Sequence, residues 1–139
     1  MAKFEIADKI TLRIEGGYQQ AKEDGGNWTG GKIGVGKLIG TNHGISAPVL
    51  CAYLKRTATL EEMLHLNTAT ARLIRKQNYW DKIFGDDILS QDIANKIYDT
   101  AINVGLSPAI KWAEIETGVS VDGKMDAILL QALNTKFKN

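Results

Sequence analysis

The chain has 139 residues, of which 44% are hydrophobic and 24% are charged, values ordinary for a soluble globular protein with one hydrophobic core. Its 17 basic and 16 acidic residues give a formal net charge of +1, which argues against nucleic-acid binding driven by bulk electrostatics. Cys51 is the only cysteine, so an internal disulfide is excluded.

The N-terminal stretch MAKFEIADKI carries charges throughout, and it has neither the apolar core nor the small-residue cleavage site of a signal peptide. No apolar run approaches the roughly 20 residues that span a bilayer. We therefore expect a protein that is synthesised in the cytoplasm and has no membrane span. We further expect a monomer.

The pattern at the start of the chain predicts one helix and then an irregular segment. Ile6, Ile10 and Ile14 recur every four residues, which predicts a helix with one apolar stripe. Ten of the 14 glycines lie between residues 16 and 44. Because a glycine inside a helix costs about 1 kcal/mol relative to alanine, we expect a glycine-rich loop or a small β-hairpin there.

Helical periodicity and capping residues predict helices for the rest of the chain, and therefore an all-α fold with at most minor β structure. The predicted starts are Ser46 with Pro48, the capping box Thr59 to Glu62, the stretch ATARLIRKQNYW, Ser90, Ser107 and Asp126. The predicted ends are Phe84, a left-handed C-cap at Gly105, and Gly118.

Three other kinds of site are poorly supported. The stretch GKIGVGKL, residues 31 to 38, has the spacing of a phosphate-binding loop, but Leu38 stands where that loop needs serine or threonine. His43 and His65 are the only histidines and lie far apart, so we predict no metal site and no cofactor. Neither histidine belongs to a recognisable nucleophilic triad motif.

Glu15 is the strongest candidate for chemistry. It follows Ile14 at the predicted end of the first helix and precedes Gly16 and Gly17. The partial negative charge of a helix C-terminus and partial burial both raise the pKa of a carboxyl group, as a general acid near neutral pH requires. The alternative interpretation is an exposed glutamate before a capping glycine.

Further polar residues follow in the glycine-rich segment. Glu23 and Asp24 come eight and nine residues after Glu15, and glycoside hydrolysis generally needs two carboxyl groups. Thr41 and Asn42 open the stretch TNHGIS. They either orient a water or contact a sugar hydroxyl, or they serve in turns and caps.

These motifs resemble glycoside hydrolase family 108, a lysozyme-like family of N-acetylmuramidases from phages and bacteria, some of which are named secretion activators. The resemblance is carried in order by EGGY (15–18), DGG (24–26), TNHGIS (41–46), NYW (78–80) and YDTAINVG (98–105). Residues 109 to 134 resemble the peptidoglycan-binding segment that follows the catalytic part in this family. The implied organisation is a lysozyme-like catalytic part, 1–104, with a peptidoglycan-binding-like helical segment, 105–139, packed on it as one compact unit.

The resemblance implies that Glu15 protonates the glycosidic oxygen, and we assign Asp24 as the base or water-orienting group with Thr41 assisting. Phage lysozymes of a related type place an aspartate nine residues after the acid and a threonine six residues further on. Asp24 fits that spacing but residue 30 is glycine, so Thr29 and Thr41 are both candidates for the third role. Residues 27 to 40 form an insertion between the glycine pair and the TN-GI stretch.

The predicted activity is hydrolysis of the β-1,4 bond between N-acetylmuramic acid and N-acetylglucosamine in peptidoglycan glycan strands. The predicted sugar contacts are Tyr18, Thr41, Asn42, Trp80, Tyr98 and Asn103, although aromatic residues are more often part of a core. An enzyme made inside the cell reaches the wall only with a holin, through another export route, or after lysis, as a phage or prophage endolysin does. The competing interpretation is a non-catalytic cell-wall-binding or secretion-associated helical module.

Overall fold

The computed structural model describes residues 1–12 and 17–138. These residues form two compact units, one made of residues 1–12 with 75–138 and the other of residues 17–74. We call them unit 1 and unit 2. The described residues form helices and three isolated β-bridges but no regular strand. The predicted all-α class is confirmed.

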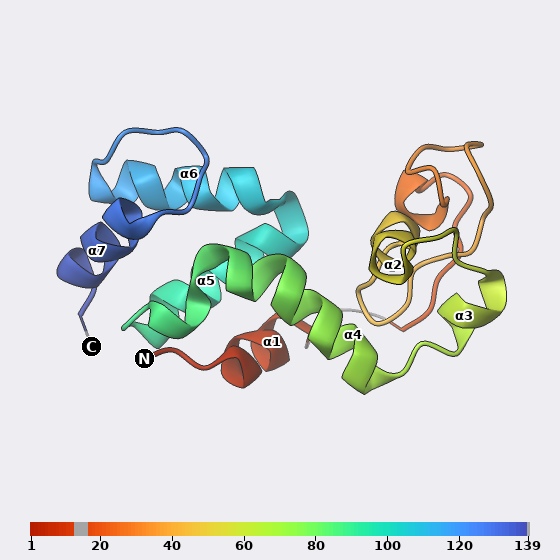
Figure 1. Cartoon of the computed structure of the whole chain (residues 1–139), viewed down its shortest axis with the longest axis horizontal. Helices are drawn as coiled ribbons and strands as arrows, with labels where there is room; N and C mark the ends of the chain where they lie inside the picture. The colour runs from red at the N-terminus through yellow and green to blue at the C-terminus, as the bar shows by residue number, and fades with distance from the viewer. Residues whose placement is uncertain (13–16, 139) are drawn as a thin grey trace. The chain divides into compact units, whose positions relative to one another are not determined.

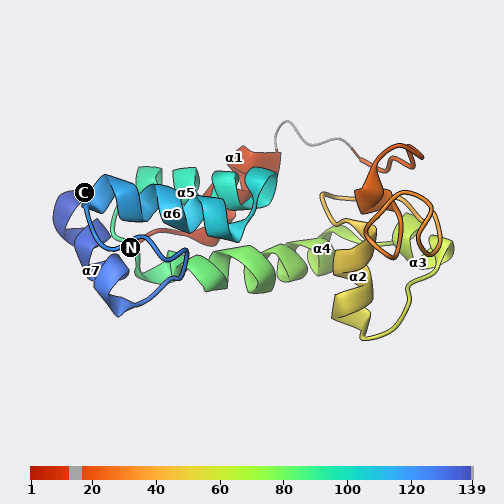
Figure 2. The ribbon, with the colours of Figure 1, turned by 90° about the horizontal axis from the view of Figure 1, so that it is seen from above.

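Unit 1 is built around α5 (Gln91–Val104), which packs against both α1 (Phe4–Leu12) and α6 (Leu106–Thr117) (Figure 1). The last helix, α7 (Ala127–Lys136), packs against α6. Figure 2 shows α5 and α6 side by side from a second direction. Three aromatic rings, those of Phe4, Trp80 and Tyr98, meet edge to face in the core, with centroids 5.7 to 5.8 Å apart.

The buried face of α1 differs from the predicted one. Ile6 and Ile10 are 44% and 43% exposed, so the predicted apolar stripe is wrong for these two residues, and Ile14 lies outside the described residues. The buried positions are instead Phe4, Ala7, Asp8 and Thr11, which share one helical face because they are three, four and seven residues apart. This face includes the carboxylate of Asp8, so a prediction from hydropathy alone would not identify it as the buried face.

Asp8 is buried because its carboxylate has strong partners. The guanidinium of Arg75 donates from Nε to Oδ1 at 2.7 Å and from Nη2 to Oδ2 at 2.9 Å, a two-point geometry that suits arginine and carboxylate. The hydroxyl of Tyr98 also donates to Oδ1, at 2.6 Å. Burial and then the bond to Asp8 raise the pKa of Tyr98, so the phenol stays a donor. The three side chains join α1, the end of α4 and α5.

A continuous helical run carries the chain from α4 (Thr68–Arg75) through the π-helical segment η2 (Lys76–Trp80) and the 3-10 turn η3 (Asp81–Ile83). A π turn hydrogen-bonds residue i to residue i+5, so it brings residues five apart towards the same side. Arg75 and Trp80 are both buried as a result. The run ends at Phe84, as predicted, in the left-handed conformation. A further 3-10 turn, η4 (Gly85–Asp87), follows.

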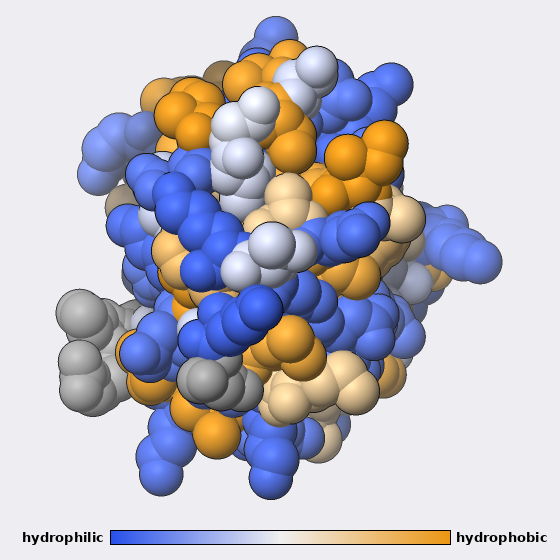
Figure 3. Space-filling view, turned by 90° about the vertical axis from the view of Figure 1, so that its left-hand side faces the viewer, coloured by the Kyte–Doolittle hydropathy of each residue, from blue (hydrophilic) through white to orange (hydrophobic). Residues whose placement is uncertain are grey.

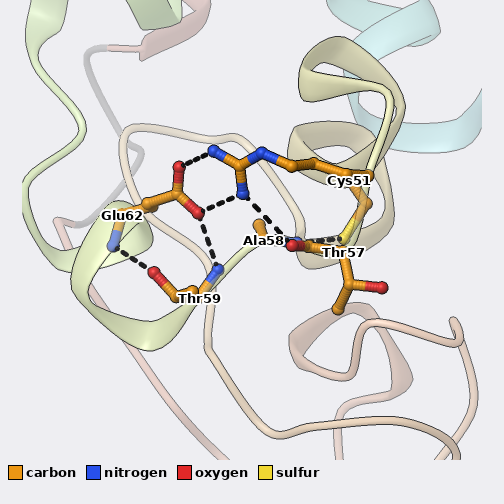
Figure 4. A network of polar contacts seen from close by, with 6 residues as sticks. Cys51, Thr57, Ala58, Thr59 and Glu62 are labelled. Carbon is orange, nitrogen blue, oxygen red and sulfur yellow. Dashed lines mark hydrogen bonds and ion pairs between the residues drawn. The ribbon is translucent and has the colours of Figure 1, made fainter.

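Unit 2 contains α2 (Ala47–Leu54), α3 (Leu60–Leu64) and most of α4. Its core consists of Ile39, Ile45, Ala47, Leu50, Ala58, Met63, Leu66, Ala71 and Ile74. The capping box predicted for α3 is confirmed, because the Thr59 side chain accepts from the Glu62 amide and the Thr59 amide donates to the Glu62 carboxylate. Arg56 adds two bonds to the same carboxylate, at 2.8 and 2.5 Å. Figure 4 shows Thr59 and Glu62 within this network of polar contacts.

Most of the predicted helix boundaries are confirmed, with one correction. Ser90 and Asp126 cap α5 and α7 with their side chains, and α6 ends before a left-handed Gly118. Gly105 has a positive φ of 120° but a ψ of 160°, so its predicted left-handed helical cap is wrong. The reason is that α6 begins at the next residue, Leu106. Gly105 therefore ends one helix and begins the next, with a positive φ that favours glycine.

Asp8→Asn should destabilise the protein by about 3–5 kcal/mol, because it removes the charge of a buried carboxylate that accepts two bonds from the Arg75 guanidinium. Urea unfolding followed by circular dichroism should show a lower midpoint at an unchanged slope. Asp81→Asn is the control, since the exposed pair of Lys76 and Asp81, 3.0 Å apart, should contribute at most about 1 kcal/mol. Equal midpoints for the two variants would contradict this prediction.

Glu62 should make stability depend on acid pH. The hydrogen bond from Arg56, and then that of the Thr59 backbone, lower the pKa of Glu62 from 4.5 to about 2. The stabilisation that Glu62 provides should therefore be complete above the pKa of this group in the unfolded chain. It should disappear as pH falls from about 4.5 towards about 2. Melting temperatures of wild type and Glu62→Gln should differ at pH 6 and converge in that window. Glu61→Gln, which changes the neighbouring exposed glutamate, should not show this convergence.

Candidate active site

Glu15, the predicted acid, lies outside the described residues, which resume at Gly17. The site is therefore described from the segment that follows it, in unit 2. Two backbone hydrogen bonds pair Gln19 with Thr41, from Gln19 N to Thr41 O at 3.0 Å and from Thr41 N to Gln19 O at 2.9 Å. Residues 22 apart in the sequence are thus held next to each other without a regular sheet.

The insertion at residues 27–40 folds back on itself. Trp28 forms an isolated bridge with Leu38, and the amides of Ile39 and Gly40 both donate to the carbonyl of Asn27. Gly40 has a φ of +90°, and a Cβ there would lie 2.6 Å from the carbonyl oxygen of Gln19, so only glycine fits. The two ends of the insertion are therefore hydrogen-bonded to each other, and Thr41 lies beside Gln19 despite the inserted residues.

A chain of side-chain hydrogen bonds connects Thr41 to Asp24. The hydroxyl of Thr41 donates to Asn27 Oδ1 at 2.6 Å, and Asn27 Nδ2 donates to Gln19 Oε1 at 2.7 Å. Gln19 Nε2 in turn donates to Asp24 Oδ2 at 3.2 Å. The two residues that the sequence suggested for the water-activating role are brought together through two amide side chains.

Asp24 combines a fixed position with access to solvent. Its Oδ1 accepts from the amide of Gly26 at 2.9 Å and caps the 3-10 turn η1 (Gly25–Asn27). Its Oδ2 accepts from Gln19, and the residue is exposed. Each carboxylate oxygen can accept a further bond. The arrangement suits a base that takes a proton from a water.

The structure distinguishes between the two threonines considered for the third role. The side chain of Thr29 accepts from the amide of Lys37 at 2.9 Å and closes the insertion. It has no hydrogen bond in the chain that ends at Asp24. Thr41 is half-buried and belongs to that chain, so the geometry favours Thr41.

Comparison with known proteins identifies the family. The family model of Glycosyl hydrolase 108 matches residues 9–105. The chain belongs to this glycoside hydrolase family. No curated protein matches it by sequence. Among solved structures it is similar to that of Brucella abortus SagA, with a TM-score of 0.76 and 30% sequence identity over 95% of this chain and 68% of that chain.

Two residues of the TNHGIS and EGGY motifs have clear structural partners in this glycoside hydrolase family 108 chain. Asn42 is buried, and its Nδ2 donates to the carbonyls of Met63 and Leu64 at the end of α3, so it holds the end of this helix, and its contact with sugar stays a prediction. The half-buried Tyr18 donates to the carbonyl of Ile39 at 2.9 Å, and burial raises its pKa. Its contact with sugar stays a prediction.

The family motifs in unit 1 supply core residues. Trp80 and Tyr98 are both fully buried, and a Cβ on Gly85 would lie 2.2 Å from the Trp80 ring. The predicted sugar contacts of Trp80 and Tyr98 are therefore wrong. Asn103 is exposed on α5 and donates to the carbonyl of Asp99 at 2.9 Å, and its contact with sugar stays a prediction.

Gln19 and Asn27 were not predicted from the sequence. The signal that could have suggested them is their position, since Gln19 follows the EGGY motif and Asn27 directly follows the DGG motif. In residues 1–12 and 17–138, no group of three or more histidine, cysteine, aspartate or glutamate side chains could hold a metal ion. Nor does this part of the family member contain a helix that could cross a membrane.

Proposed function

We propose that this member of glycoside hydrolase family 108 is an N-acetylmuramidase that cleaves the β-1,4 bond between N-acetylmuramic acid and N-acetylglucosamine in peptidoglycan. Family membership supports glycoside hydrolysis. The single observation that carries the site assignment is the hydrogen-bonded chain from Thr41 through Asn27 and Gln19 to Asp24. In the sequence, Glu15 lies two residues before Gly17, where the description of this segment begins.

In the proposed reaction, Glu15 donates a proton to the bridging oxygen as the bond from that oxygen to the anomeric carbon breaks. A water attacks the anomeric carbon, and Asp24 accepts the proton that this water loses. Thr41 contacts the same water. One water is consumed, one bond is exchanged, and each carboxyl group ends in the protonation state opposite to its starting one.

The enzyme is proposed to act on the cell wall after synthesis in the cytoplasm. Export or lysis then gives it access to the glycan strands, with a holin or another export partner. We infer that it works as a monomer and without a metal or cofactor, because two carboxyl groups and a water suffice for the reaction.

Glu15→Gln should reduce lysis of purified peptidoglycan by at least about 10²–10⁴-fold, because the amide cannot donate the proton that the leaving oxygen needs. Asp24→Asn should lower the rate by a similar factor. Glu23→Gln removes the exposed carboxylate next to Asp24 and is the matched control, expected to keep wild-type activity. Turbidity loss and release of reducing ends measure the rates, and an active Glu15→Gln enzyme would refute the assignment of the acid.

The bond specificity is tested on the same products. Borohydride reduction of the digest should convert N-acetylmuramic acid, and not N-acetylglucosamine, into its alditol, because muramidase cleavage leaves the muramic acid at the reducing end. If Asp24 acts as a base, the new anomeric centre should be inverted. Reduced glucosamine would overturn the muramidase assignment while leaving glycoside hydrolysis intact.

A second function, binding of the wall by the C-terminal segment, is favoured by a cavity between α6 and α7. The cavity has a volume of about 400 Å³, comparable to that of small-ligand sites. It is lined by Thr117, Val119, Ile128, Gln131, Ala132, Thr135 and Lys136. Figure 3 shows separate hydrophobic patches among hydrophilic side chains on one face of the molecule. We infer that the cavity contacts glycan, with apolar and hydrogen-bonding groups together.

Ile128→Asp should weaken sedimentation of the protein with insoluble peptidoglycan by about tenfold, because it places a charge at an apolar wall of this cavity. Ile115→Asp is the matched control, since Ile115 is 68% exposed, Ile128 is 70% exposed, and only Ile128 lines the cavity. Cleavage of soluble glycan fragments should be unchanged in both variants. Equal sedimentation of the two variants would exclude the cavity as the wall contact.

A further inference from the structure

We propose that Gln19 and Asn27 are positioning residues, which fix Thr41 as a hydrogen-bond acceptor and Asp24 as a carboxylate on either side of the attacking water. This inference rests on the proposed function. It adds to that function the mechanism that orients the water, and it assigns a role to two side chains that the family motifs do not include.

Asn27 is fully buried, and its hydrogen bonds determine which way its amide points. Nδ2 donates to Gln19 Oε1 at 2.7 Å and to the carbonyl of Ala21 at 2.9 Å, so both of its hydrogens are used. Oδ1 must then face Thr41, 2.6 Å away, as an acceptor. The single hydrogen of the Thr41 hydroxyl is committed to Asn27, and towards any other group this hydroxyl can only accept.

Gln19 transmits the same direction to Asp24. Its Oε1 accepts from Asn27 Nδ2 and from the amide of Ala21 at 3.0 Å. The nitrogen end of the amide is therefore turned to Asp24, where Nε2 donates to Oδ2 at 3.2 Å. Every donor in the chain points from Thr41 through Asn27 and Gln19 towards Asp24, and a carboxylate rather than a carboxylic acid is the complementary end group. We call this directed chain of hydrogen bonds the relay.

This direction has a consequence for the water. A water that donates one hydrogen to Asp24 and the other to Thr41 keeps its lone pairs for the anomeric carbon, which is the orientation that attack requires. If Thr41 could donate instead, it would occupy a lone pair of the water and oppose attack. The buried amide of Asn27 removes that alternative.

Charged side chains near Asp24 lie in the same glycine-rich segment. Lys22 and Glu23 flank it in the sequence, and Lys32 lies at the part of the insertion that approaches Gly25. The helix packed against η1 is α2, whose residues Ala47–Leu54 include no charged side chain. A negative charge introduced at Gln19 would face Asp24 directly.

Gln19→Glu tests the relay. The new carboxylate keeps the bonds from Asn27 and Ala21 but turns its other oxygen to Asp24, and adjacent like charges disfavour ionisation. The acid limb of the pH–rate profile should move up by about one pH unit. Gln20→Glu is the matched control, because Gln20 is the exposed neighbour, bonds to the Leu38 carbonyl, and changes the net charge equally. Superimposed profiles for the two variants would overturn the proposal.

Thr41 provides the second test. Thr41→Val keeps the shape but cannot accept a bond, and it should lower kcat by about 10- to 100-fold with little change in KM. Thr41→Ser restores the hydroxyl and should recover most of the loss. Equal kcat values for valine and serine would contradict the orientation of the water by this hydroxyl.

A measurement without substrate separates this inference from the proposed function. The titration midpoint of the Asp24 carboxyl, followed by carbon NMR, should be higher in Gln19→Glu than in wild type and unchanged in Gln20→Glu. If wild type does not cleave peptidoglycan, the proposed function fails, whatever the titration shows. If wild type cleaves but the midpoint does not move, only the relay fails.

Discussion

The buried contact of Asp8 with Arg75 and Tyr98 determines which face of the first helix is inside. Removing two charges from water is costly, so a buried ion pair persists only where its geometry is good and its remaining groups are satisfied. Here both guanidinium bonds and the phenol bond are in place. Rotating α1 to bury Ile6 and Ile10 would move Asp8 away from the Arg75 guanidinium and the Tyr98 hydroxyl. Burying the two isoleucines would contribute about 1.5–3 kcal/mol each, but it would also remove the edge-to-face packing of Phe4 on Trp80 and Tyr98. The electrostatic contact and this aromatic packing together decide the helix face.

The candidate site has a different basis, because it lies in a glycine-rich segment with no regular sheet to stiffen it. Rigidity comes instead from a few converging bonds. The backbones of Gln19 and Thr41 pair, the Asn27 carbonyl accepts from two amides, and the Asn27 side chain uses both ends of its amide. A buried amide with all its hydrogen bonds made is costly to displace. The glycines let the backbone segments approach each other closely, and the amide side chains of Gln19 and Asn27 then hold them in place.

A structural feature could be predicted from the sequence when the residues that form it lie close together in the chain. The caps at Thr59, Ser90 and Asp126 depend on residues within one turn, and all three were predicted correctly. The face of α1 depends on partners 67 and 90 residues away, which no local pattern reveals. The relay lies between these cases. Asp24 was chosen from the sequence because carboxylates commonly serve as acids and bases. Asn27 belongs to the candidate site only through its hydrogen bond with Thr41, 14 residues later, and this contact cannot be read from the sequence.

The family motifs contain both kinds of residue, and burial separates them. Trp80 and Tyr98 stand in strings that resemble glycoside hydrolase family 108 as clearly as the string around Asp24 does, yet both are fully buried against Phe4. A lysozyme-like fold needs its core rings as much as its chemistry needs its carboxylates, so resemblance alone cannot assign a role to a motif residue. An aromatic ring contacts a sugar only if a face of it is accessible. Exposure must therefore be known before a motif residue is assigned to the substrate, and by that criterion we assign the proposed chemistry to polar side chains in the loop of unit 2.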